Sequence, residues 1–219
     1  MHFLLFDDPK LAILYFVVLI LSLSVHEFAH AWSAFKLGDD TAARMGRLSL
    51  NPMVHADPIG TIAFPLLGVP FGWAKPVPVN PARFRRDVSM GRGMAITAAA
   101  GPVSNVLLAL ACAVLLGLLV RYAPDLVGPR SAGRTLLVVA IGMNVNLALF
   151  NLLPVPPLDG SRIVDGFVPY RLRPRWEAFT AYAPFMLVAI FLFGGRIIAG
   201  PSNFVLGILY DIIRAIRAA

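Results

Sequence analysis

Long apolar stretches, separated by short polar segments rich in arginine, dominate the hydrophobic pattern of the chain. The stretches cover about residues 10–37, 93–120, 134–153 and 178–198. Each approaches or exceeds the roughly 20 residues that a helix needs to cross a bilayer. Gly200-Pro201 then interrupts the pattern, and we interpret the apolar segment at about 203–217 as a short fifth span rather than a surface helix. The pattern predicts an all-α polytopic membrane protein.

The region between the first two spans has a different pattern. Residues 59–71 are apolar but too few to cross, and prolines and a glycine interrupt them, so we predict a short re-entrant segment. Residues 47–50 alternate polar and apolar, which is typical of a short strand. Residues 73–80 contain Pro76 and Pro78 and are expected to be extended. We therefore expect a re-entrant or β-hairpin-like segment here.

Composition agrees with a membrane protein of one domain, residues 1–219. Of the 219 residues, 58% are hydrophobic and 14% charged, whereas soluble domains carry about 25% charged residues. The net charge of +7 does not indicate nucleic acid, because the arginines lie between apolar stretches, as in loops that face the cytoplasm and anionic lipid. By the same rule the loops after the first span, before the second and after the third are cytoplasmic.

The sequence His26-Glu27-Phe28-Ala29-His30 ends the apolar part of the first span. Residues four apart share one face of a helix, so His26 and His30 can bind one metal ion. Glu27 beside them can take a proton from a metal-activated water. Ionisable groups within a membrane segment are costly, which favours a metal site over histidines that only make core hydrogen bonds.

A catalytic zinc usually has three protein ligands, so a third must come from elsewhere. Asp159, which follows a proline-rich turn after the third span, is our candidate, although a turn-capping aspartate fits its position equally well. Asn151 can stabilise a developing oxyanion or make an interhelical hydrogen bond. On the predicted topology His26, His30 and Asp159 all lie near the cytoplasmic ends of their spans.

Further residues are candidates for substrate binding. His55 lies in a turn-rich stretch, where it can gate the site, bind substrate or bond to backbone, and we do not assign it as a ligand. A transmembrane substrate must unwind before water can attack it. The extended stretch with Trp73, Pro76 and Val77, or alternatively residues 47–50, can hold the unwound peptide by strand addition.

An ordered set of motifs resembles the site-2 protease family of intramembrane zinc metalloproteases, in its short bacterial and archaeal form without a PDZ domain. The matching segments are residues 25–31, 51–58, 71–80, 100–105 and 151–160. The resemblance implies a three-helix catalytic core with additional C-terminal helices, and one Zn²⁺ held by His26, His30 and Asp159. It also implies that Glu27 is catalytic and that Asn151 assists at the substrate carbonyl.

The expected function is therefore an intramembrane zinc endopeptidase in a prokaryotic cell membrane, with its site toward the cytoplasm. Its partners would be transmembrane protein substrates and the lipid bilayer, with no nucleic acid. The alternatives are a membrane scaffold or adaptor with a structural metal, and a metal-dependent lipid hydrolase. A structural zinc would be closed by four protein ligands, whereas the chain offers three and a base.

Overall fold

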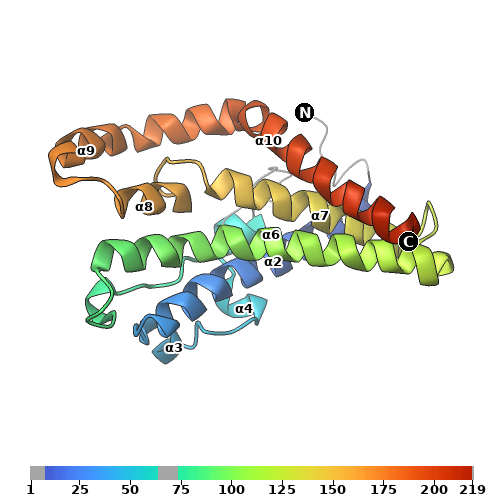
Figure 1. The fold of residues 1–219 in the computed structure, drawn as a ribbon, viewed down its shortest axis with the longest axis horizontal. Coiled ribbons are helices and arrows are strands. Elements are labelled where there is room, and N and C mark those ends of the chain that lie inside the picture. Colours follow the sequence, from blue (N-terminus) through green and yellow to red (C-terminus); the bar gives the residue numbers. More distant parts are fainter. Residues whose placement is uncertain (1–7, 64–73, 219) are drawn as a thin grey trace.

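The computed structural model describes residues 8–63 and 74–218, and in these ranges the regular structure is entirely helical. Four helices carry the length and hydropathy of membrane spans. They are α2 (Pro9–Lys36), α6 (Met90–Tyr122), α7 (Ala132–Asn151) and the part of α10 from residue 192 to 218. Figure 1 shows them as the long elements of the molecule. These features confirm the predicted all-α polytopic class.

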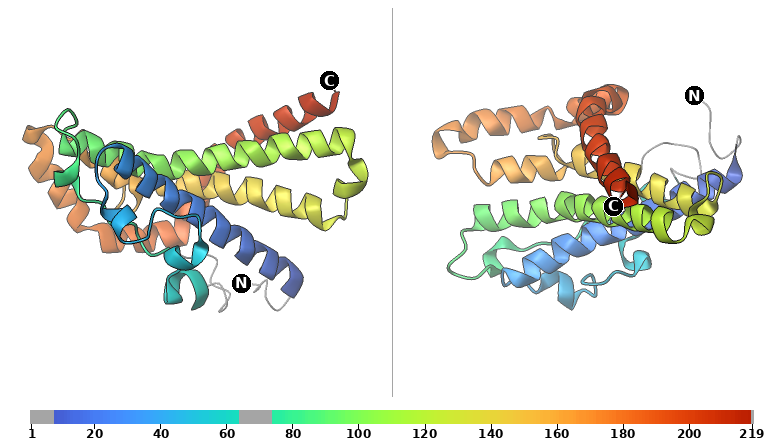
Figure 2. Two further views of the ribbon diagram at one scale, coloured as in Figure 1. Left: turned by 90° about the horizontal axis from the view of Figure 1, so that it is seen from below. Right: turned by 45° about the vertical axis from the view of Figure 1, so that its right-hand side comes forward.

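Helix α6 is the centre of the bundle, because it packs against α2, α7, α10 and the short helix α8 (Asp159–Asp165). α6 and α7 run side by side, joined by a short connection containing the 3₁₀ helix η3 (Pro124–Val127), and α2 crosses them obliquely (Figure 2). Small residues at the contact allow these backbones to approach closely.

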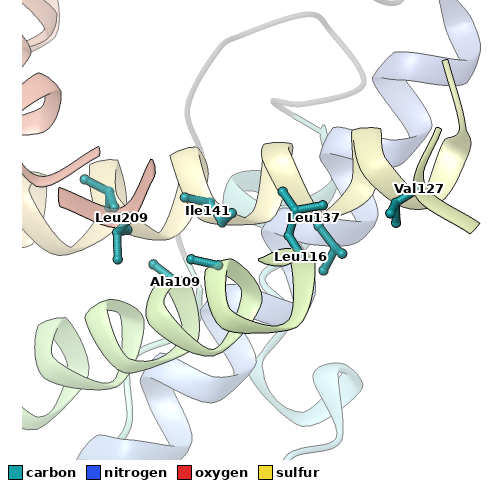
Figure 3. Packing of buried hydrophobic residues seen from close by; sticks show 8 residues of the cluster. Ala109, Leu116, Val127, Leu137, Ile141 and Leu209 are labelled. Atoms are coloured by element: carbon teal, nitrogen blue, oxygen red, sulfur yellow. The ribbon is translucent and has the colours of Figure 1, made fainter. Parts of the chain in front are cut away.

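The apolar core lies where α6, α7 and α10 meet (Figure 3). Ala109, Ala113 and Leu116 of α6 pack against Leu137, Ile141 and Val145 of α7, with Leu209 of α10 and Val127 of η3 at the edges. Alanine on α6 faces larger side chains on α7, so the two surfaces interdigitate. The core holds α6 and α7 in a fixed register beside the polar site.

Helix α10 (Ala183–Ala218) replaces the predicted fourth and fifth spans. The interruption expected at Gly200-Pro201 was wrong, because the helix continues through Pro201. α10 changes direction where its colour passes from orange to red (Figure 1). Proline removes one N–H donor and kinks a helix without ending it when neighbouring contacts hold the chain. Ser202 supplies such a contact by donating from Oγ to Oδ1 of Asn146 on α7, at 2.8 Å.

The connection between α2 and α6 forms short turns. It contains α3 (Thr41–Arg44), α4 (Pro52–His55), the π-helix η1 (Pro58–Ala63) and the 3₁₀ helix η2 (Pro81–Arg83). The strand predicted at 47–50 was wrong, because residues 48 and 49 form a bend and the Arg47 side chain is buried. Most of the predicted re-entrant segment 59–71 lies outside the described residues, as does Trp73.

The polar segment between the third and fourth predicted spans is largely helical. It contains α8, the 3₁₀ helix η4 (Tyr170–Leu172) and α9 (Arg173–Ala181). Gly166 ends α8 directly on α6, since a Cβ there would come within 2.5 Å of the Gly91 carbonyl oxygen. The two glycines thus allow α8 to lie against the first turn of α6, which places Asp159 beside the bundle.

Candidate metal centre

The two histidines of α2 lie on the same buried face of that helix. His26 is 4% exposed and His30 is 8% exposed, and their rings meet edge to face with centroids 4.6 Å apart. Their Nε2 atoms are 3.0 Å apart. The spacing of four residues therefore brings both imidazoles to one point, as the sequence predicts.

Asp159 reaches the same point from the other half of the chain. It is the first residue of α8, and its Oδ2 lies 3.0 Å from Nε2 of His26 and 3.2 Å from Nε2 of His30. Among the described residues, these side chains form the one cluster of His, Cys, Asp or Glu with metal-ligand spacing. The structure thus brings together the three residues that the sequence analysis assigned as ligands.

The cluster fits a tetrahedral zinc site. Zn–N and Zn–O bonds of about 2.0–2.2 Å place adjacent ligand atoms about 3.3 Å apart. The three ligand atoms form a triangle with sides of 3.0, 3.0 and 3.2 Å. One ion beside this triangle would bind all three atoms and keep a fourth position for water or substrate.

The outer nitrogen of each ring faces a hydrogen-bond acceptor. Nδ1 of His26 lies 2.6 Å from Oδ1 of Asn105, and Nδ1 of His30 lies 2.7 Å from the carbonyl oxygen of Thr97, both on α6. A ring that donates from Nδ1 presents a lone pair at Nε2. Two such lone pairs and a carboxylate oxygen then converge, and a cation satisfies them all.

Gly101 of α6 leaves the space for this cluster. A Cβ at this position would lie 2.5 Å from Nε2 of His30 and 2.6 Å from Nε2 of His26. Any larger residue would therefore occupy the space around the ligand atoms. The groups that approach this glycine closely are the two imidazoles.

The charge of Asp159 suits a cation site. Burial by itself would raise the pKa of the Asp159 carboxyl, but protonated imidazoles of His26 and His30 donate from Nε2 to its anion and hold that pKa below its ordinary value. A bound cation takes the place of these Nε2 protons. Asp159 is thus a carboxylate at neutral pH, which is the form that binds zinc.

Glu27 is buried beside the cluster and contacts the extended segment 74–80. Its Oε2 accepts a hydrogen bond of 3.0 Å from the backbone N–H of Val77. The side chain of Val77 packs against Ala31 and Ala42, so Val77 contributes its backbone to the site. This contact fixes the Glu27 carboxylate between α2 and the segment.

The segment 74–80 is held by buried polar groups on its protein side. Lys75 N–H donates to the His55 carbonyl at 2.9 Å, and Arg47 donates from Nη2 to the Lys75 carbonyl at 2.5 Å. Asn80 N–H donates to Oδ2 of Asp39 at 2.6 Å, and Asp39 is fully buried. The segment is therefore anchored on both sides of Val77.

The remaining candidates lie outside the ligand cluster. Asn151 ends α7, and its Nδ2 donates to the Leu147 carbonyl at 2.9 Å. His55 is fully buried, and its Nε2 lies 2.7 Å from the Ser49 carbonyl oxygen. The Pro76 carbonyl lies 3.4 Å from Nη2 of Arg47.

The sequence analysis did not assign the residues that orient the cluster. Thr97 and Asn105, which face the outer ring nitrogens, are not among the site residues predicted from the sequence. Arg47 and Asp39 are also absent from that prediction, although both are buried. A buried charge in an apolar protein requires a specific partner, and that is the signal that could have identified them.

Membrane-length helices and a buried cluster of two histidines and a carboxylate define the class of protein, which is a membrane metalloprotein with a hydrolase-like centre. Residues 128–194 match the sequence profile of Peptidase family M50. No solved structure matches the chain.

The curated relatives agree with this class. "Putative zinc metalloprotease YwhC" of Bacillus subtilis is 41% identical over 177 residues, which cover 80% of this chain and 78% of the relative. "Putative zinc metalloprotease Rip2" of Mycolicibacterium smegmatis is 29% identical over 177 residues, covering 79% of this chain and 64% of the relative. The chain therefore belongs to Peptidase family M50, the site-2 proteases, and is an integral membrane zinc metalloprotease.

Proposed function

We propose that the whole chain is one membrane domain that cleaves peptide bonds of transmembrane protein substrates. The observation that carries this proposal is the convergence of His26, His30 and Asp159 on one point, with Glu27 beside them on a membrane-length helix. In this assignment the three residues hold the zinc ion and Glu27 is the general base.

The protein groups have separate roles in this mechanism. A zinc ion held by His26, His30 and Asp159 would polarise the scissile carbonyl and lower the pKa of the attacking water. Glu27 accepts the proton of the attacking water and gives it to the leaving amine, while Val77 N–H keeps the carboxylate in place. Asn151 uses one amide hydrogen for Leu147, and its second hydrogen can reach a substrate carbonyl.

The segment 74–80 is our proposed contact for the unwound substrate. The N–H groups of Lys75, Val77 and Asn80 already donate to protein acceptors, and Pro76 and Pro78 have none. The segment therefore offers a substrate mainly carbonyl acceptors. A substrate strand would pair with it by donating its own N–H groups.

We place the site toward the cytoplasmic side. Basic residues are concentrated between α2 and α6 and again between α7 and α10, which is the signature of cytoplasmic loops. His30 in the last turns of α2 and Asp159 at the start of α8 lie next to these basic segments in the chain. Reporter fusions at both ends of α6 measure this orientation, and a cytoplasmic signal after α6 would contradict it.

Glu27→Gln tests the enzymatic role. We expect purified Glu27→Gln to retain zinc and to lose cleavage of a transmembrane peptide by at least about 1,000-fold, because the amide cannot take a proton. Glu177→Gln, at an exposed position of α9, is the matched control and should cleave normally.

The same assay separates the other function classes. A scaffold with a structural metal would show no peptide cleavage by the wild-type protein. Hydrolysis of lipid but not of peptide by the wild-type protein would identify a lipid hydrolase. Either result would contradict the proposed function.

A further inference from the structure

Two asparagines continue from His26 into the interior of the bundle. Oδ1 of Asn105 faces Nδ1 of His26 at 2.6 Å, and Nδ2 of Asn105 donates to Oδ1 of Asn144 on α7 at 2.8 Å. Nδ2 of Asn144 in turn donates to Oγ of Ser22 and to the carbonyl of Ala140, both at 2.9 Å. Both asparagines are 0% exposed.

These hydrogen bonds have a single direction. A backbone carbonyl can only accept, so the Ala140 carbonyl fixes the Asn144 amide with its NH₂ group toward it. The Oδ1 of Asn144 must then face Asn105 and accept from it. Asn105 consequently presents its own Oδ1 to His26, and an oxygen there requires a proton on Nδ1.

His30 reaches the same result more directly. Its Nδ1 lies 2.7 Å from the backbone carbonyl of Thr97, which also can only accept. Both imidazoles are therefore oriented from main-chain carbonyls. His30 is oriented directly, and His26 is oriented through Asn105 and Asn144, with Nδ2 of Asn105 also 3.4 Å from the Ser22 carbonyl oxygen. The longer path connects α2, α6 and α7 at the depth of the metal centre.

We propose that Asn105 and Asn144 are positioning residues, which together fix the ring proton of His26 at Nδ1 and leave Nε2 for the metal. This inference rests on the proposed role of His26 as a zinc ligand. Asn105 acts on the ring itself, and Asn144 acts through Asn105. We call the three residues His26, Asn105 and Asn144 the amide relay.

The test measures the zinc affinity of the full chain by chelator competition. Removing the partner of a metal-binding histidine typically weakens affinity about 10–100-fold, and we expect this for Asn105→Ala. Asn144→Ala should weaken affinity by a smaller factor, roughly 3–10-fold, because it acts through Asn105. Asn105→Asp combined with Asn144→Ala keeps an acceptor toward Nδ1 without setting a carboxylate oxygen against Oδ1 of Asn144, and it should restore affinity to near the wild-type value.

The control and the double variant separate orientation from packing. Asn146→Ala, also on α7, removes the hydrogen bond to Ser202 and should leave zinc affinity unchanged. Adding Asn144→Ala to Asn105→Ala should cause no further loss of zinc affinity, since Asn144 contacts His26 only through Asn105. If Asn105→Ala fails to fold, the zinc affinities of Asn144→Ala and Asn146→Ala still compare a variant of the relay with its control on the same helix.

Specific outcomes overturn the inference. Zinc affinity of Asn105→Ala or Asn144→Ala within about twofold of wild type would do so, as would additive losses in the double variant. His26→Ala with undiminished affinity would remove the ligand on which the relay rests. A wild-type protein that binds zinc but cleaves no peptide would contradict the proposed function alone, because the relay is measured by binding.

Discussion

Gly101 is the single residue on which the space for the ligand atoms most depends. The position lies on α6, opposite both imidazoles, and a methyl group there would come within 2.6 Å of each Nε2 atom. Glycine in a helix is normally unfavourable by about 1 kcal/mol relative to alanine. The site keeps it because no side chain fits between α6 and the histidines.

We predict that Gly101→Ala abolishes zinc binding or weakens it at least about 100-fold, because the methyl group displaces the ligand atoms. Gly142→Ala is the matched control, since a Cβ at this helical position of α7 meets no atom within 4 Å. It should be neutral or raise stability by up to about 1 kcal/mol. Equal zinc content in the two variants, measured by metal analysis, would contradict the prediction.

At the scale of elements, the segment 74–80 depends on groups from the α2–α4 region. Arg47 and Asp39 are buried and bond to its backbone on either side of Val77. These charges hold the segment 74–80 in contact with Glu27, although the segment has no regular secondary structure. The segment is thus a fixed wall of the site, although its prolines exclude it from a regular sheet interior.

We predict that Arg47→Ala lowers stability by about 2 kcal/mol, because it removes charged hydrogen bonds to the Lys75 and Pro76 carbonyls. Peptide cleavage should fall while zinc content stays normal. Arg44→Ala is the matched control, since Arg44 is exposed and its ion pair with Asp40 is worth at most about 1 kcal/mol. Equal thermal unfolding temperatures for the two variants would contradict the role of Arg47 in holding the segment 74–80.

At the scale of the whole molecule, the ligand cluster connects the first helix with the turn after the third. His26 and Asp159 are 133 residues apart in the chain. A ligand that binds the folded state stabilises it by about 2.7 kcal/mol at a free concentration 100 times its Kd. Bound zinc should therefore stabilise the whole bundle.

We predict that chelator treatment lowers the thermal unfolding temperature and that added zinc restores it. Asp159→Ala should lose this response, because one of the three ligands is missing. Asp165→Ala is the control on the same helix, where the carboxylate pairs with Arg173 instead. A zinc response that survives in Asp159→Ala would show that the metal binds elsewhere.

Much of this architecture follows from the sequence. Hydropathy alone places α2, α6 and α7 to within a few residues, and helical periodicity puts His26 and His30 on one face. Contacts between distant helices are different, because they depend on the register of packed surfaces. The bond between His26 and Asn105 spans 79 residues and has no local signal. The helix end predicted at Pro201 also has a non-local cause of error, since contacts with α7 hold α10 together through this proline.

The long separation between the ligands has a consequence for the newly made protein. Ribosomes deliver the amino-terminal helix first, and the carboxylate that meets its imidazoles follows 133 residues later. Until the third membrane helix and the turn beyond it have been inserted, the nascent chain holds only a part of the cluster. The order of synthesis therefore delays the complete set of three ligands until Asp159 has been made.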